Sequence, residues 1–292
     1  MALFLAAVEQ GLIWGLAALG VYLSFRVLNF PDLSVDGTFP LGAAVTATLI
    51  SRGWDPFGAL ALAAAAGMAG GLWTAALSTR FRIQGLLAGV LTMIMLYSLN
   101  LRVMGRPNLP LLGRPSAFRT LSILTGVPGD WAKVLGAGLL GLGCAALLIA
   151  LFRTELGLAL RASGDNPTTA QAYGLSPAAQ LTWGLALSNG LVALSGGLAA
   201  QYLGFADIGM GIGTIVSSLA AVIIGEILFR PRGVGWGLLA ALGGSVVYQG
   251  AIRVALRYGS RLGFTASDMR LLTALVVLAA LVAPAWRLRK EG

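Results

Sequence analysis

The chain has 292 residues, of which 57% are hydrophobic and only 11% are charged, against roughly 25% charged residues in an average soluble domain. A soluble globule of this length could not cover so much apolar surface, so the composition predicts an all-α protein that crosses a membrane several times. The chain has no histidine, its one cysteine is Cys144, and neither Lys133 nor Lys290 follows a glycine. Imidazole metal sites, cysteine clusters, internal disulfides and a Walker A loop are therefore excluded.

Apolar runs of about 20 residues, the length that crosses the hydrocarbon layer, predict the membrane helices. The first run has no basic residue before it and exceeds a signal-peptide core, so we expect it to be retained. The second is shorter and reaches only about 21 Å as a helix, less than the roughly 30 Å hydrocarbon layer. About nine membrane segments are expected, all within one transmembrane domain over residues 1–292: Phe4–Phe25, Gly37–Ile50, Phe57–Thr79, Gly85–Leu101, Trp131–Phe152, Gln180–Leu203, Gly211–Phe229, Val234–Leu256 and Leu271–Trp286.

The formal net charge of +9 comes from basic residues in short groups between the apolar runs. This pattern is typical of membrane surfaces, so we expect anionic lipid and not nucleic acid as a partner. With nine segments the basic residues divide equally between the two sides, and the positive-inside rule assigns no orientation. Only the Arg-Leu-Arg-Lys tail after the last run favours an inner C-terminus.

The polar stretch Asn29–Pro40, just ahead of and into the short second run, is either an aqueous loop or irregular backbone at membrane depth. The second alternative is permitted only where protein or a water-filled cavity satisfies its polar groups, as in the broken helices of transporters. Five of its residues are candidates for lining a solute path: Asn29, Asp32, Ser34, Asp36 and Phe39. Asp32 and Asp36 are four residues apart and would share one face of a helix.

Three further path candidates lie on later runs. Met93 and Tyr97 belong to the fourth run, where side-chain packing is the favoured explanation. Glu226 ends the seventh run, and an ion pair with Arg230 four residues later is the alternative to a role in the path.

A polar stretch between two strong runs, Glu155–Pro177, carries the signals of a short helix. Asp165 or Asn166 could cap its start, Pro167 suits the first helical position, and Gly174 suits a left-handed stop. We therefore predict a two-turn helix over Pro167–Tyr173 that lies across the end of the bundle. The alternative is a loop that rests on lipid headgroups.

Three stretches together form a wider pattern. They are Gly157-x-Ala159-Leu160-Arg161-Ala162-x-Gly164-x-Asn166-Pro167-x-x-Ala170-x-x-x-Gly174, then Leu28-Asn29-Phe30-Pro31-Asp32-Leu33-Ser34-Val35-Asp36-Gly37, and Ala221-Val222-Ile223-Ile224-Gly225-Glu226 followed by Gly233 to Gly244. They resemble the cytoplasmic loop, the segment before the second span and the C-terminal glycine stretch of ABC importer permeases for branched-chain amino acids and simple sugars. Asp36 and Glu226 depart from the family pattern. The run from Asp32 to Ala43 is similar to a subgroup in which one permease serves a binding protein for aromatic amino acids.

The resemblance implies a permease subunit of the bacterial inner membrane, without enzymatic activity or a cofactor of its own. ATP and Mg would be bound by a separate ATP-binding subunit, a periplasmic or lipid-anchored binding protein would deliver a small polar solute, and the permease would form a homodimer. Residues 153–179 would form the coupling loop that docks on the ATP-binding subunit, with contacts from Arg161, Gly164, Asp165, Asn166, Pro167, Thr169, Ala170, Tyr173 and Gly174. Arg161 would tether the loop to a carboxylate or a lipid phosphate.

Two rival functions make different demands on the sequence. An ion-coupled secondary transporter needs an ion or proton site, and the runs contain few carboxylates near the membrane centre. A membrane-embedded lipid-modifying enzyme needs clustered carboxylates or histidine, and the sequence shows neither. The outer loop 102–130 carries four arginines, which could meet acidic patches of a binding protein or form a solvated rim.

Overall fold

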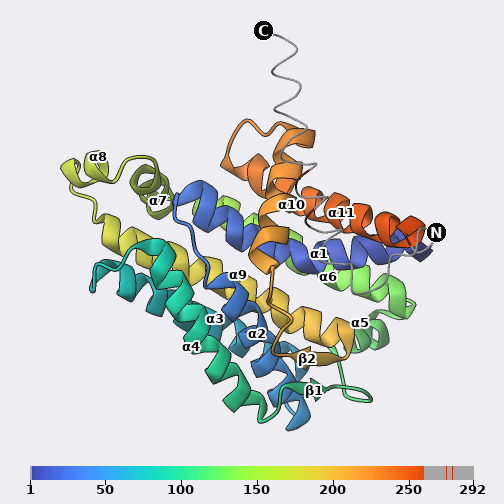
Figure 1. Cartoon of the computed structure of the whole chain (residues 1–292). Helices are drawn as coiled ribbons and strands as arrows, with labels where there is room; N and C mark the ends of the chain where they lie inside the picture. The colour runs from blue at the N-terminus through green and yellow to red at the C-terminus, as the bar shows by residue number, and fades with distance from the viewer. Residues whose placement is uncertain (1, 260–273, 275–277, 279–292) are drawn as a thin grey trace.

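The computed structural model describes residues 2–259 together with Ala274 and Leu278. This part of the chain is a helical bundle with one small pair of strands (Figure 1). A π-helical turn over Leu23–Val27 ends the first helix. The other elements are α1 Ala2–Tyr22, α2 Val35–Ser51, α3 Pro56–Thr79, α4 Gly85–Met104, β1 Asn108–Pro110, α5 Ala117–Thr125, α6 Gly129–Leu151, α7 Glu155–Asp165, α8 Pro167–Ala172, α9 Pro177–Leu203, β2 Phe205–Asp207, α10 Thr214–Phe229 and α11 Val234–Gly259.

Six of the described helices are long and apolar enough to cross a membrane: Phe4–Val27, Pro56–Thr79, Gly85–Met104, Gly129–Leu151, Pro177–Leu203 and Val234–Arg257. They confirm six of the predicted runs. Helices α2 and α10 have only 17 and 16 residues. The predicted run Gly211–Phe229 is shorter in the structure, because residues 211–213 form a turn and α10 begins at Thr214, so a membrane span over this run is not confirmed. The predicted run Leu271–Trp286 lies outside the described residues, apart from Ala274 and Leu278. The described part therefore combines six long helices with two apolar helices of intermediate length, α2 and α10, and three shorter ones, α5, α7 and α8.

Helix α9 lies at the centre of the bundle, where it packs against α1, α2 and α3. Its approach to α2 depends on glycine. A Cβ at Gly42 of α2 would overlap the backbone of Ala193, and a Cβ at Gly196 of α9 would overlap the carbonyl of Phe39. Without a hydrophobic effect between helices in lipid, such close backbone packing is a main source of association energy. The glycine-rich composition therefore serves packing at this interface.

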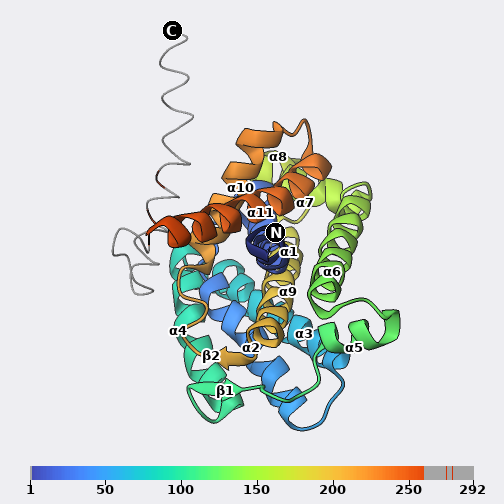
Figure 2. The ribbon, with the colours of Figure 1, turned by 90° about the vertical axis from the view of Figure 1, so that its right-hand side faces the viewer.

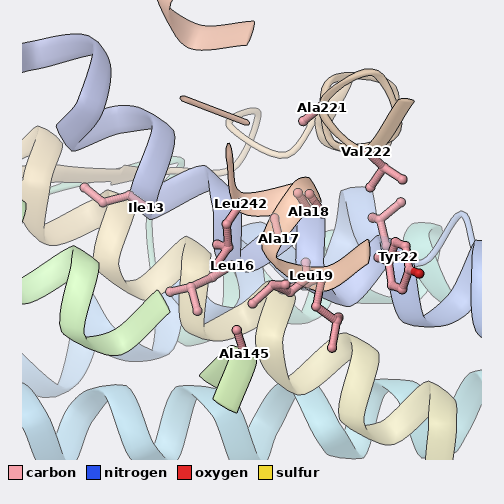
Figure 3. Packing of buried hydrophobic residues seen from close by; sticks show 14 of the residues in the cluster. Ile13, Leu16, Ala17, Ala18, Leu19, Tyr22, Ala145, Ala221, Val222 and Leu242 are labelled. Atoms are coloured by element: carbon pink, nitrogen blue, oxygen red, sulfur yellow. The ribbon is translucent and has the colours of Figure 1, made fainter. Parts of the chain in front are cut away.

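Helix α1 is surrounded by the second half of the chain. Its buried side chains pack against α6, α10 and α11, as Figure 3 shows. The labelled residues of this cluster are Ile13, Leu16, Ala17, Ala18, Leu19 and Tyr22 of α1, Ala145 of α6, Ala221 and Val222 of α10, and Leu242 of α11. Figure 2 shows the same arrangement from the side, with α6 and α4 on opposite edges of the bundle.

The two ends of the bundle differ in structure. At one end β1 and β2 pair antiparallel, with Leu109 opposite Ala206, and so join the segments that follow α4 and α9. At the other end lie α7 and α8, which connect α6 to α9 (Figure 1). Helices α1, α3 and α6 run towards the end that holds α7 and α8, and α4, α9 and α11 run away from it (Figure 1). Each end therefore presents its own set of polar residues to one side of a membrane.

Candidate functional site

Helix α8 has the boundaries that local sequence signals specify. Asn166 caps it, because its side-chain Oδ1 accepts a hydrogen bond of 3.0 Å from the backbone N–H of Thr169. Of the two predicted caps, Asn166 is right and Asp165 is not; Asp165 is the last residue of α7. Gly174 follows with a φ of +82°, which favours glycine. The predicted helix Pro167–Tyr173 is confirmed within one residue, since it ends at Ala172.

Helices α7 and α8 border an open groove of about 630 Å³ at the end of the bundle. Its lining residues are Glu155, Leu158, Ala159, Ala162, Asp165, Asn166, Thr169, Ala170, Tyr173 and Leu175. Ala170 is only 3% exposed and Tyr173 is 84% exposed. The two side chains therefore lie at the base and the rim of the same groove. Because Ala170 is enclosed by this chain, Thr169 and Tyr173 are better placed than Ala170 to meet a partner.

Helix α7, which borders the groove, packs against the end of the first membrane helix at Gly164. A Cβ at Gly164 would overlap the carbonyl oxygen of Val27, so only glycine lets α7 pack this closely against the π-helical turn. Arg161, by contrast, is exposed, and it forms no ion pair with any carboxylate of the described residues. The tether that was expected from Arg161 to a carboxylate is therefore not found within this part of the chain.

The segment between the π-helical turn and α2, residues 28–34, is irregular backbone that other helices largely cover; Asn29 and Pro31 are its exposed residues. The ring of Phe30 fills the space beside Gly85, and the backbone of Leu33 lies against Gly89, both on α4. On the opposite side, the side chain of Leu28 packs on Gly184 of α9. Protein groups therefore cover most of this polar backbone, as the second of the two alternatives requires; its place at membrane depth stays a prediction.

A fully buried polar cluster closes this segment at its centre. The Asp32 carboxylate accepts hydrogen bonds from the Ser34 amide at 2.9 Å, the Ser34 hydroxyl at 2.5 Å and the Asn189 side-chain amide at 2.7 Å. Asn189 Oδ1 accepts a further bond of 2.7 Å from the Thr38 hydroxyl. None of these four side chains is exposed. The cluster joins α9 to the start of α2 and satisfies a buried carboxylate without a cation from the described residues.

Asp36 connects α2 to α10. Its carboxylate accepts hydrogen bonds from the backbone N–H groups of Gly213 at 3.1 Å and Ile215 at 2.8 Å, which lie at the start of α10. Two short helices thus begin beside each other within the bundle, and a carboxylate satisfies free amides of the second one. Asp32 precedes α2 and bonds to α9, so the prediction that Asp32 and Asp36 share one helical face is wrong.

A cavity of about 620 Å³ lies against the first turn of α10, a volume typical of small-molecule sites. Residues of α1, α10 and α11 line it, together with the turn before α10: Gln10, Trp14, Met210, Ile212, Gly213, Thr214, Val216, Ser217, Tyr248, Gln249, Ile252, Arg253, Leu256 and Ala274. Arg253 Nε donates a hydrogen bond of 3.2 Å to Gln10 Oε1. The cavity therefore combines aromatic, amide and guanidinium groups.

None of the eight residues proposed from sequence for a solute path lines this cavity. Two of them lie directly behind it: Asp36 bonds to Gly213, and the Phe39 ring lies 6.0 Å from that of Trp14. Sequence reasoning missed the lining itself, because α1 and α11 look like uniform apolar runs. The signal that could have found it is the presence of Gln10 and Arg253 within or beside those runs.

The other path candidates are dispersed. Met93 lies beside Gly37 of α2, Tyr97 is 56% exposed on α4, and Asn29 is an exposed residue of the irregular segment. Glu226 forms an ion pair with Arg26, and the expected pairing with Arg230 is wrong. The reason is that α10 ends at Phe229 and Arg230 adopts a left-handed conformation, which breaks the i,i+4 geometry.

Comparison with known proteins identifies the family of this chain. Residues 3–282 match the family model described as branched-chain amino acid transport system / permease component. The chain belongs to this family. A tyrosine transport system permease protein of Clostridioides difficile (strain R20291) is 38% identical over 275 residues, which cover 94% of this permease and 89% of the relative. An uncharacterized protein of Rickettsia prowazekii (strain Madrid E) is 40% identical over 229 residues, or 78% of this permease and 79% of that protein. No solved structure matches the permease.

Proposed function

We propose that the permease is the membrane subunit of an ATP-driven ABC importer in the bacterial inner membrane, and that it moves a small polar solute inward. The observation that carries the proposal is the capped α8 beside an open groove, in a chain that has no Walker A loop. A partner subunit that binds ATP and Mg would dock in this groove. A short rigid helix with a glycine joint suits the transmission of a rigid-body movement.

Contacts within the bundle offer a route for that movement. Helix α8 leads through Gly174 into α9, and α9 carries Asn189, which bonds to Asp32 ahead of α2. Helix α2 in turn holds the start of α10 through Asp36. Displacement of α8 would therefore reach both short helices through a chain of specific hydrogen bonds, and both border the cavity or the residues behind it.

The opposite end of the bundle would face the periplasm. Arginines 102, 106, 114 and 119 lie there, next to β1 and α5, and all four are exposed. A solute-binding protein with acidic patches could dock against them, and complementary charge would speed its association. The expected homodimer would place two such surfaces under one binding protein.

An amino acid is the solute class that the cavity suits. Arg253 could bind the carboxylate of an amino acid, and Trp14 offers an apolar ring for its side chain. The C. difficile relative is named for tyrosine transport. We therefore propose an aromatic amino acid as the first solute to test.

A pair of matched variants on α8 tests the docking role. Thr169 and Gln171 are both exposed, but only Thr169 lines the groove. Thr169→Glu should place a charge in the interface, prevent co-purification with the ATP-binding subunit and lower ATP-driven uptake into proteoliposomes at least ten-fold, since each 1.4 kcal/mol of lost binding is ten-fold. Gln171→Glu should still co-purify with the ATP-binding subunit and should retain ATP-driven uptake. Normal uptake by Thr169→Glu would refute docking in this groove. Uptake by the isolated permease down an ion gradient would instead favour a secondary transporter.

A further inference from the structure

A second open groove, of about 1050 Å³, lies away from α8 and from the cavity beside α10. It runs along α11 and is bordered by α1 and α6. Figure 2 shows these three helices on the side of the bundle that faces the viewer. The apolar wall of the groove includes Leu12 of α1, Leu142 of α6, and Leu239 and Val246 of α11. Apolar side chains on the outside of a membrane protein face the hydrocarbon layer, so an apolar groove along these helices would face lipid.

One end of this groove is positively charged. Arg230 and Arg232 flank Pro231 in the turn between α10 and α11, and both line the groove. Both are exposed, and neither forms an ion pair with a carboxylate among residues 2–259. Trp236, which is 69% exposed, lies in the first turn of α11 next to them. Tryptophan and arginine side chains in this order are typical of the boundary between headgroups and hydrocarbon.

The length of the groove matches one leaflet of a bilayer. From Trp236 to Val246 the helix advances about 15 Å, at 1.5 Å per residue. Half of the roughly 30 Å hydrocarbon layer is the same distance. The groove therefore has a cationic end at the membrane surface and an apolar body that ends near the midplane, which is the distribution of charge and carbon in a single anionic phospholipid.

We propose that this groove binds one anionic phospholipid, with its phosphate at Arg230 and Arg232 and an acyl chain along α11. The lipid would bridge α6 and α11, which form two walls of the groove. A free phosphate would satisfy the arginines but would leave the apolar body of the groove unfilled. Arg230 and Arg232 lie at the same end of the bundle as α8. If α8 faces the cytoplasm, as the proposed function has it, the lipid belongs to the cytoplasmic leaflet, and this one assignment rests on the proposed function. The binding itself does not depend on any ATP-binding partner.

Native mass spectrometry of the full-length permease in mild detergent tests this site. Phosphatidylglycerol and phosphatidylcholine with identical acyl chains would be titrated against the protein. Each arginine near an anionic headgroup should contribute about five-fold in affinity, so R230Q/R232Q should weaken phosphatidylglycerol binding by about 25-fold and phosphatidylcholine binding much less. The matched control is R80Q/R82Q at the end of α3, another exposed Arg-x-Arg pair at this end of the bundle. It should bind phosphatidylglycerol as the wild type does.

A third variant tests the apolar body of the groove. Leu142 is 56% exposed on α6, so Leu142→Trp would fill part of the groove without disturbing the core. This variant should weaken the binding of both lipids, while the melting temperature of the protein stays unchanged. Equal phosphatidylglycerol binding in R230Q/R232Q and wild type would overturn the proposal, as would an equal loss in the R80Q/R82Q control. Displacement of the lipid by glycerol phosphate at similar concentrations would show a soluble-anion site instead, and would also overturn it.

Discussion

Asn189 joins the centre of α9 to the start of α2, and its replacement by alanine tests the strength of the buried polar cluster. The bond from its Nδ2 to the Asp32 carboxylate is 2.7 Å long, and both side chains are fully buried. Hydrogen bonds to charged groups contribute about 1.5–3 kcal/mol to stability, and a buried carboxylate that loses a donor keeps its desolvation cost. Thr38 retains a second acceptor, the Ser34 carbonyl at 3.0 Å, so its hydroxyl is not orphaned. We expect Asn189→Ala to lower the free energy of unfolding by about 2–3 kcal/mol.

Asn100 provides the matched control within the same bundle. It is also fully buried, but it donates a single neutral hydrogen bond of 3.1 Å to the Gly37 carbonyl, and its Oδ1 has no partner among the described residues. Hydrogen bonds between membrane helices average about 0.6 kcal/mol, so Asn100→Ala should cost no more than that from its lost bond. Unfolding in mixed micelles, followed by far-ultraviolet circular dichroism, measures both variants under one condition.

Exchange of the amide and the carboxyl group between Asp32 and Asn189 distinguishes loss of their hydrogen bond from the general effect of altering a buried site. Asn189→Asp alone would place a second carboxyl group against Asp32 and should be the most destabilising variant, because two carboxyl groups in one buried site cannot both ionise and Asp32 loses its amide donor. The double variant D32N/N189D restores one carboxylate and one amide, and should recover at least half of that loss. The reasoning is refuted if Asn189→Ala is no less stable than Asn100→Ala, or if the double variant is no better than Asn189→Asp.

Three further predictions concern other joints of the bundle. Asp36→Ala should lower stability by about 1–2 kcal/mol through loss of the cap on α10, and Asp36→Asn should recover part of it in the same unfolding assay. Arg26→Gln should change stability by less than about 1 kcal/mol, because the side chains of Arg26 and Glu226 are 49% and 25% exposed, and a loss above 2 kcal/mol would contradict this. Gly164→Ala should shift the melting temperature further than Gly174→Ala, because only the first meets backbone atoms; equal shifts would disprove the close approach.

The location of α8 illustrates what local sequence signals achieve. Its cap, its first proline and its terminal glycine act through bonds within a few residues, so Asn166, Pro167 and Gly174 were sufficient to place it. The residues proposed for a solute path were predicted less well, because their surroundings depend on residues that are distant in the sequence. Whether Asp32 lies in water or in protein depends on Asn189, which is 157 positions away in the sequence.

Glu226 shows the same limit in a single side chain. Sequence spacing offered Arg230 as its partner, but the helix ends one residue before Arg230 and the ion pair forms with Arg26, 200 positions away. The cavity beside α10 is another example. Trp14 and Arg253 come from helices at opposite ends of the described chain, and nothing in either segment indicates the other.

The sequence by itself determined that this protein lives in a membrane, where its long helices run and where α8 begins and ends, because hydrophobic length and helix caps are local properties. The sequence also indicated that α2 is short, but only the tertiary structure decided that α2 and α10 begin beside each other and that Asp36 connects them. It also decided which groups line the cavity and the lateral groove. These features depend on contacts between residues that are distant in the chain, and hydrophobic length and local propensity contain no information about such contacts.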